Sequence, residues 1–167
     1  MATPFSIVHE FDCDAQAYWT LFWDPAFNDA QFERMQCSRT VTLLRDDGTT
    51  IVRDQEVTPE RDLPFVLKSA LGGASLRYHE HGVFEKPSGP MRIEISVPAL
   101  GARFSLQGFY SVGALAQNRC RREFAGECAI RIPLLGGMAE QIVVGNMRES
   151  YEKGAETVRD WLEKTSP

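Results

Sequence analysis

The alternation of apolar and polar residues is most regular at the end of the chain, where apolar side chains recur at three- and four-residue steps over residues 133–164. This spacing predicts one long amphipathic helix, with Pro133 in its first turn and Glu140 on its polar side. Its apolar face comprises Ala139, Val143, Met147, Tyr151, Ala155, Val158 and Leu162. Its glycines oppose helix formation, so each is expected to mark a close approach to a backbone or a ligand. They are Gly136, Gly137, Gly145 and Gly154.

Most of the chain before this helix alternates with the two-residue period of β-strands. The predicted strands are residues 4–11, 37–45, 49–58, 75–85, 91–97, 102–112 and 119–132. The Asp46–Gly48 turn is typical of a tight hairpin, and a loop over 113–118 is expected between the last two strands. Short helices are predicted at 15–22, capped by Asp14, at 26–35, and within 63–73.

Successive strands are joined by short connections and not by crossover helices, so the sheet is predicted to be antiparallel. About seven such strands are too many to lie flat beside one helix, whereas a strongly curved sheet wrapped around the helix buries both apolar faces. The sequence therefore predicts an α+β fold in which the sheet grips the C-terminal helix. No repeat or linker divides the chain, so residues 1–167 are expected to form a single domain.

Several local features, together with this order of elements, resemble a known superfamily. They are the opening HEFDCDAQAYWTLFWDPAFN, Leu63–Pro64 before a strand with Tyr78-x-Glu80, the stretch 132–137 followed by Glu140, and a late Trp161–Leu162. These features are similar to an uncharacterised branch of the START-like (helix-grip, SRPBCC) superfamily, which includes lipid-transfer domains, plant hydrophobic-ligand carriers and polyketide cyclases. The likeness covers nearly the whole chain. It implies a deep, largely apolar cavity between the sheet and the long helix, and it implies no catalytic residue.

Composition and charge limit the classes of partner and the cellular location that are expected for the protein. The net charge is −5 and basic residues are scattered, with only Arg119, Arg121 and Arg122 close together, so neither nucleic acid nor an anionic membrane surface is expected as a partner. No stretch approaches the roughly 18 apolar residues of a membrane span, and a cytoplasmic protein is expected. The four cysteines lack metal-site spacing and are expected to be reduced thiols, without a metal or cofactor. No pattern indicates an oligomeric state.

The predicted strand 75–85 carries the candidate polar groups of the cavity. Tyr78 and Glu80 share a face with apolar residues, and this face is expected to point inward. A carboxylate there needs a partner, so Glu80 is expected to meet an arginine, a hydroxyl group, water or a ligand. Arg53 is a natural partner only if its own strand face points inward, and the two faces of that strand differ too little in polarity to decide this.

Apolar candidates for the cavity wall come from two other segments. They are Phe65, Leu67 and Leu71, expected near the opening, and Met138 and Ile142 on the long helix. His79 and His81 share the outward face of their strand, and with no third ligand visible they are expected to be solvated and not to bind a metal. His9 lies among apolar residues and is expected to be a core or rim residue, with proton transfer as the alternative.

Three functions follow from this pattern. The first is binding or transport of a lipid-like or polycyclic hydrophobic small molecule in the cavity, with Tyr78 and Glu80 as orienting groups. The second is a cyclase- or dehydratase-type enzyme that uses Glu80 as general acid/base, with Tyr78 or His9. The third is a non-catalytic domain with a filled core and an apolar surface patch.

Overall fold

The computed structural model describes residues 2–165, and its strands form one antiparallel sheet. The strand order across the seven-stranded sheet is β1-β7-β6-β5-β4-β3-β2. The strands are β1 (Thr3–Phe11), β2 (Cys37–Asp46), β3 (Thr50–Pro59), β4 (Tyr78–Glu85), β5 (Met91–Ser96), β6 (Phe104–Ala116) and β7 (Arg119–Ile130). Every neighbouring pair except β1–β7 is consecutive in the chain, and every pair is antiparallel, as predicted.

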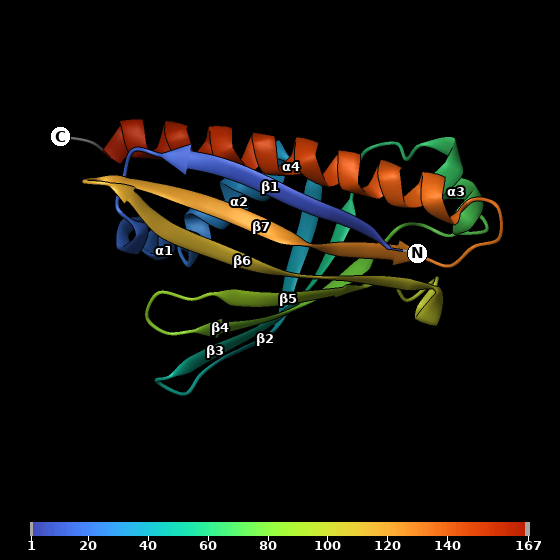
Figure 1. The fold of residues 1–167 in the computed structure, drawn as a ribbon, viewed down its shortest axis with the longest axis horizontal. Helices are drawn as coiled ribbons and strands as arrows, with labels where there is room; N and C mark the ends of the chain where they lie inside the picture. Colours follow the sequence, from blue (N-terminus) through green and yellow to red (C-terminus); the bar gives the residue numbers. More distant parts are fainter. Residues whose placement is uncertain (1, 166–167) are drawn as a thin grey trace.

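Helices cover the inner side of the sheet, and the longest runs along it. Within residues 2–165 they are α1 (Ala15–Phe22), α2 (Pro25–Arg34), α3 (Phe65–Ala70) and α4 (Gly136–Thr165), and a 3-10 turn covers Gly101–Arg103. Figure 1 shows α4 beside β1 and β7, while the rest of the sheet curves away from α4 towards β2. Because α2 contacts both α4 and β2, it bridges the helix and the far edge of the sheet. The predicted α+β helix-grip arrangement is confirmed.

Aspartate side chains fix several local turns. Asp14 caps α1, as predicted, by accepting a hydrogen bond from the Ala17 backbone N–H at 2.7 Å. Asp24 caps α2 in the same way, with Pro25 in the first turn. In the β2–β3 hairpin, the Asp47 side chain accepts hydrogen bonds from the backbone N–H groups of residues 49 and 50, which closes the turn.

The long helix begins three residues later than predicted. Leu134 has a left-handed φ of +65°, which interrupts the helix between Pro133 and Gly136, so the prediction of Pro133 in the first turn is wrong. A Cβ at Gly136 would lie 2.2 Å from the Ile130 carbonyl oxygen, so only glycine permits this close approach to β7. At Gly154 a Cβ would lie 3.0 Å from the Gln31 side chain of α2.

The other two helix glycines do not mark a close approach, contrary to expectation. A Cβ at Gly137 or Gly145 would meet no atom within 4 Å, so close approach does not explain these two positions.

Glu140, which was predicted to lie on the polar face of the helix, is buried, with 4% of its surface exposed. Its carboxylate accepts hydrogen bonds from the Ile130 backbone N–H at 2.8 Å and from the Thr3 hydroxyl at 2.7 Å. The buried carboxylate therefore ties the start of α4 to β7 and β1.

The last hairpin also differs from the prediction of a loop over 113–118. Strand β6 continues to Ala116, with a register shift between Ala114 and Ala116, and Gly113 pairs with Arg121. Asn118 takes a φ of +57°, which allows a tight turn directly before β7. The prediction that a loop begins at Gly113 is therefore wrong, because Gly113 is a paired residue of β6.

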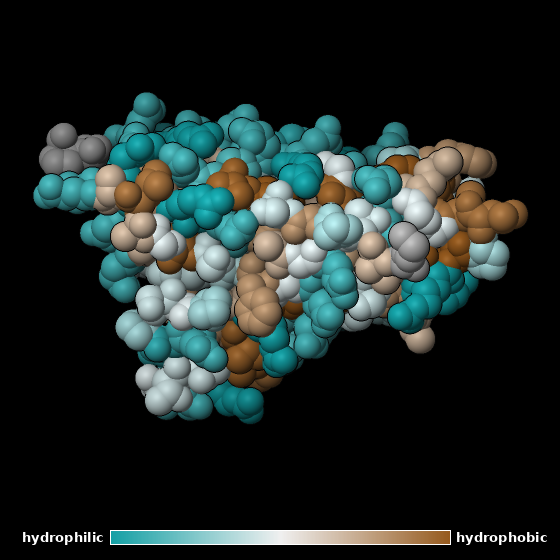
Figure 2. All heavy atoms as spheres, viewed as in Figure 1, coloured by the Kyte–Doolittle hydropathy of each residue, from teal (hydrophilic) through white to brown (hydrophobic). Residues whose placement is uncertain are grey.

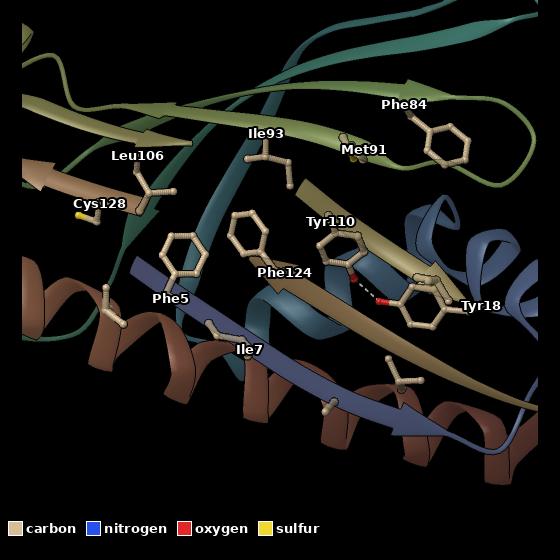
Figure 3. Close-up of a cluster of buried hydrophobic side chains, with 14 of the residues drawn as sticks. Phe5, Ile7, Tyr18, Phe84, Met91, Ile93, Leu106, Tyr110, Phe124 and Cys128 are labelled. Atoms are coloured by element: carbon tan, nitrogen blue, oxygen red, sulfur yellow. Dashed lines mark hydrogen bonds between the residues drawn. The ribbon is translucent and has the colours of Figure 1, made fainter. Parts of the chain in front are cut away.

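Inward-facing side chains of the sheet pack against α1 and α4. Figure 3 shows Phe5, Ile7 and Phe124 beside one another, with Tyr110 and Tyr18 further along the core. Figure 2 shows hydrophobic residues gathered at the end of the molecule where α3 and the loop before α4 lie. Among residues 2–165, no helix is long and apolar enough to cross a membrane.

Candidate functional site

A pocket of about 570 Å³ lies between the inner face of the sheet and helices α2 and α4. This volume falls within the range of roughly 300–1,000 Å³ that is usual for small-molecule sites. On α4, Val143, Met147 and Tyr151 line it because they recur at four-residue steps on one side of the helix. The strands contribute mainly apolar side chains: Ile93, Ile95, Phe104, Leu106, Tyr110 and Phe124.

Of the residues expected in the cavity wall, three line the pocket and four lie outside it. Tyr78, Glu80 and Leu67 line the pocket. Leu71 is buried in the core outside the pocket wall, and Ile142 is half-buried outside it. Phe65 and Met138 are 81% and 56% exposed, and Leu134 in the loop before α4 is exposed as well. The α4 residues that line the pocket begin at Val143, whereas Met138 and Ile142 lie in the preceding turns of the helix, outside the pocket wall.

One polar group in the pocket wall, here called the β3–β4 cluster, consists of Arg53, Gln55 and Glu80. The face of β3 that sequence alone left open is the inner one, with Arg53 7% and Gln55 2% exposed. Glu80 Oε1 accepts hydrogen bonds from Arg53 Nη2 at 3.3 Å and from Gln55 Nε2 at 3.0 Å. The Arg53 guanidinium also lies over the rings of Phe22 and Trp23, at 5.0 and 5.3 Å from their centroids. Arg53 therefore has both a counterion and aromatic contacts.

Tyr78 lines the pocket next to this cluster. Burial raises the pKa of the Tyr78 phenol well above its ordinary value, and the nearby Glu80 carboxylate raises it further. The phenol therefore stays neutral at physiological pH and is able to donate or accept a hydrogen bond.

A second polar group, here called the β7 cluster, consists of Arg122, His9, Tyr18, Tyr110 and Tyr151. Arg122 at its centre is 2% exposed and also lines the pocket. Arg122 Nη1 donates to the Tyr18 hydroxyl at 3.1 Å, and Nη2 donates to His9 Nδ1 at 3.0 Å and to the Tyr151 carbonyl oxygen at 3.2 Å. Four aromatic rings surround the guanidinium, with centroids at 5.0 to 6.0 Å. They belong to Phe11, Tyr18, Tyr110 and Tyr151.

The hydrogen bonds of Arg122 define the tautomer of His9. Arginine only donates, so His9 Nδ1 must be the unprotonated acceptor. His9 Nε2 then carries the proton and donates to Glu152, whose carboxylate oxygen lies at 2.8 Å. Burial lowers the pKa of His9 and adjacent Arg122 lowers it further, although the Glu152 hydrogen bond opposes them. His9 is not part of the pocket wall, so it connects Arg122 to the surface.

The two tyrosines beside Arg122 share one hydrogen bond. The hydroxyl groups of Tyr18 and Tyr110 are bonded to each other, as Figure 3 shows. Burial raises the pKa of Tyr110 well above its ordinary value, and the neighbouring Tyr18 adds to this. Tyr110 is therefore a neutral phenol in the pocket wall.

Arg122 is a site residue that was not predicted from the sequence. In the sequence Arg119, Arg121 and Arg122 form one small basic group, whereas in the structure Arg122 points inward and the other two are exposed. The signal was the alternation of β7, because Arg122 shares its face with Cys120 and Phe124. A charged residue on an otherwise apolar strand face points to a buried charge with a specific role.

The remaining candidates lie outside the pocket. His81 Nδ1 is hydrogen-bonded to Asp54 on the outer face of the sheet. Among residues 2–165, no three His, Cys, Asp or Glu side chains are grouped to hold a metal ion. The four cysteines are free thiols.

Solved structures of other proteins share this fold. The Zhui aromatase/cyclase from Streptomyces sp. R1128 has a TM-score of 0.69 at 11% identity, with 100% of this chain and 97% of that chain covered. The protein TTHA0849 from Thermus thermophilus has a TM-score of 0.68 at 13% identity, with coverage of 99% and 100%. A START superfamily protein from Mycobacterium smegmatis has a TM-score of 0.61 at 12% identity, with coverage of 95% and 98%. At such low identity the likeness concerns the fold alone, and the START-like architecture expected from the sequence is confirmed.

No curated protein matches the chain significantly in sequence. One family model, described as "Protein of unknown function (DUF2505)", matches residues 6–162. This range includes every residue of the β3–β4 cluster and of the β7 cluster. Because the match extends over nearly the whole chain, the protein belongs to the DUF2505 family.

Proposed function

We propose that the protein binds a hydrophobic small molecule, lipid-like or polycyclic, in the pocket between the sheet and α4. The observation that carries this proposal is the pocket itself, about 570 Å³ in volume and lined mainly by apolar and aromatic side chains. A few polar groups converge on it from β3, β4 and β7, as is usual where a largely apolar ligand must be oriented. Tyr78 and Glu80 on β4 remain the proposed orienting groups.

Binding is favoured over catalysis because Glu80, the candidate general acid/base, already has partners. Its Oε1 accepts hydrogen bonds from Arg53 and Gln55, which suits a counterion better than a group that exchanges a proton with a substrate. His9, the other candidate, does not line the pocket. A filled core, the third alternative, is disfavoured by the volume of the pocket.

Fluorescence titration with N-phenyl-1-naphthylamine, a neutral probe that brightens in apolar surroundings, tests the proposal. We expect saturable binding of one probe per chain, and native mass spectrometry should detect the complex. The Leu106→Trp change fills the pocket and should weaken binding about tenfold or more. Leu115→Trp places the same side chain at an exposed position of the same strand and should leave binding unchanged.

Two results would overturn the proposal. One is the absence of saturable binding by the unaltered protein. The other is equal affinity of the Leu106→Trp and Leu115→Trp variants, provided that both unfold cooperatively on heating. If Leu106→Trp does not fold, Val143→Phe on α4 reduces the same pocket from its other wall and takes its place.

A further inference from the structure

Arg122 has fewer partners than a buried guanidinium needs. The group has five N–H donors, and three hydrogen bonds from it are formed, to Tyr18, His9 and the Tyr151 carbonyl. Its Nε–H is buried and has no partner within residues 2–165. All three acceptors are neutral groups, since His9 accepts through an unprotonated nitrogen. The aromatic rings around Arg122 offset part of the cost of burying its charge, but they do not neutralise it.

The carboxylates of the described chain do not supply the missing negative charge. Glu80 forms its ion pair with Arg53, and Glu152 reaches Arg122 only through the ring of His9. Glu152 is also 58% exposed, so water screens its charge. The other acidic residues of the pocket wall, Asp62 and Glu149, are exposed at its rim. Arg61 also lines the pocket, but it is only half-buried and donates to the Ser150 hydroxyl at 3.2 Å. Among the described residues, Arg122 is therefore the fully buried positive charge of the pocket wall that has no carboxylate bonded to it.

The tyrosine pair adds a second unused donor. Two hydroxyl groups bonded to each other use one of their two protons, and the other proton has no acceptor among the described residues. Tyr18 already accepts a hydrogen bond from Arg122, and Tyr110 lines the pocket directly. The β7 cluster thus offers the Arg122 Nε–H and one phenol proton but no free anionic acceptor. An excess of donors around a buried positive charge is complementary to an anion.

We infer that the ligand is an amphiphilic anion, whose carboxylate or comparable oxyanion binds Arg122 and the Tyr18–Tyr110 pair. This inference rests on the proposed function and adds the polar chemistry of the ligand to it. The apolar part of the ligand then lies against the wall formed by Leu106, Phe124 and their neighbours. The β3–β4 cluster does not bind the anion, because Glu80 already occupies Arg53 and would repel a second carboxylate.

Displacement of N-phenyl-1-naphthylamine by dodecanoate and by 1-dodecanol at pH 7.5 tests the inference, since the two competitors share a chain length and differ in charge. We expect dodecanoate to bind about 10- to 100-fold more tightly than the alcohol, the effect of one or two charge-assisted hydrogen bonds. Arg122→Gln should abolish this preference by weakening dodecanoate alone. Arg121→Gln removes an exposed arginine from the same strand and should preserve the preference.

The outcomes separate this inference from the proposed function. Failure of the neutral probe itself to bind would reject the proposed function and the inference with it. If the probe binds but dodecanoate competes no better than 1-dodecanol, the anion site is rejected and the binding function stands. Equal weakening of both competitors by Arg122→Gln would assign Arg122 a structural role. If that variant does not fold, the unaltered protein and Arg122→Lys, which keeps the charge and should keep part of the preference, decide the question.

Discussion

The two buried arginines of the pocket wall have different partners, although their surroundings are alike. Arg53 and Arg122 are 7% and 2% exposed, both lie over aromatic rings, and each has a buried Nε–H without a partner among the described residues. Arg53 forms an ion pair with Glu80, whereas Arg122 is held by a phenol, a neutral imidazole and a carbonyl oxygen. The difference teaches that burial of an arginine says little about its role until its counterion is known. A paired arginine is already neutralised, and an unpaired one retains the capacity to bind an anion.

Removing the counterion of Arg53 should have the largest effect on stability. Glu80→Gln leaves Arg53 as a buried charge without a carboxylate, which we expect to reduce the free energy of unfolding by about 3 kcal/mol. Urea denaturation monitored by circular dichroism measures this. A cost below about 1 kcal/mol would mean that Arg53 does not depend on Glu80 and would remove the contrast with Arg122.

A double-mutant cycle should separate the two clusters. Glu80→Gln and Arg53→Gln share an ion pair, so their combined cost should differ from the sum of their separate costs by about 1–3 kcal/mol. Glu80→Gln and Arg122→Gln have no common hydrogen-bond partner and should be additive within about 0.5 kcal/mol. The free energies of unfolding of the single and double variants decide this. Strong coupling between Glu80 and Arg122 would show that the two clusters act as one network.

Removing one neutral hydrogen-bond acceptor from the β7 cluster should reduce the free energy of unfolding by a moderate amount. Tyr18→Phe removes the hydroxyl that accepts from Arg122 and is bonded to the Tyr110 hydroxyl, and it should reduce the free energy of unfolding by about 1 kcal/mol. Tyr151→Phe is the matched control, because Arg122 is bonded to the backbone carbonyl of Tyr151 and this group remains. Equal costs for the two changes in thermal unfolding would indicate that the Tyr18 hydroxyl contributes nothing specific.

The smallest effect on stability is expected from a change of pH that titrates His9. The pKa of His9 is lowered in the folded protein below the ordinary value of 6.5, mainly by burial and then by Arg122. Its contribution to stability is therefore complete above pH 6.5 and is lost as the pH falls through the lowered folded pKa, since the unfolded chain takes up the proton first. Glu152 and Arg159 of α4 also face His9 and oppose each other in this shift.

We expect the unaltered protein to lose up to about 1 kcal/mol more than His9→Gln between about pH 7.5 and about pH 5.5, measured by urea denaturation at each pH. Glu80→Gln should leave the His9-dependent difference in place, because the β3–β4 cluster contains no histidine. Identical pH profiles of the His9→Gln variant and the unaltered protein would exclude His9 as the group responsible.

The resemblance to START-like domains predicted a cavity between the sheet and the helix, and a pocket lies there. The exposure of Phe65 and Met138 was not predicted, because the direction in which an apolar side chain of α3 or α4 points depends on how these helices pack against the rest of the fold. Glu140 escaped prediction for the converse reason. A carboxylate is assigned to the polar face of a helix unless its tertiary partners, here Thr3 and the Ile130 backbone, are known.

The sequence by itself determined the order of strands and helices, the antiparallel sheet, the inward direction of Tyr78 and Glu80, the Asp14 cap and the Asp46–Gly48 hairpin turn. These features depend on periodicity and local hydrogen bonding, which a single segment contains in full. Only the tertiary structure decided that Arg53 meets Glu80 and that Arg122 has no carboxylate of the described chain bonded to it. Partners of a buried charge come from other strands and helices, so their identity depends on sheet register and curvature and not on the residues next to it in the chain.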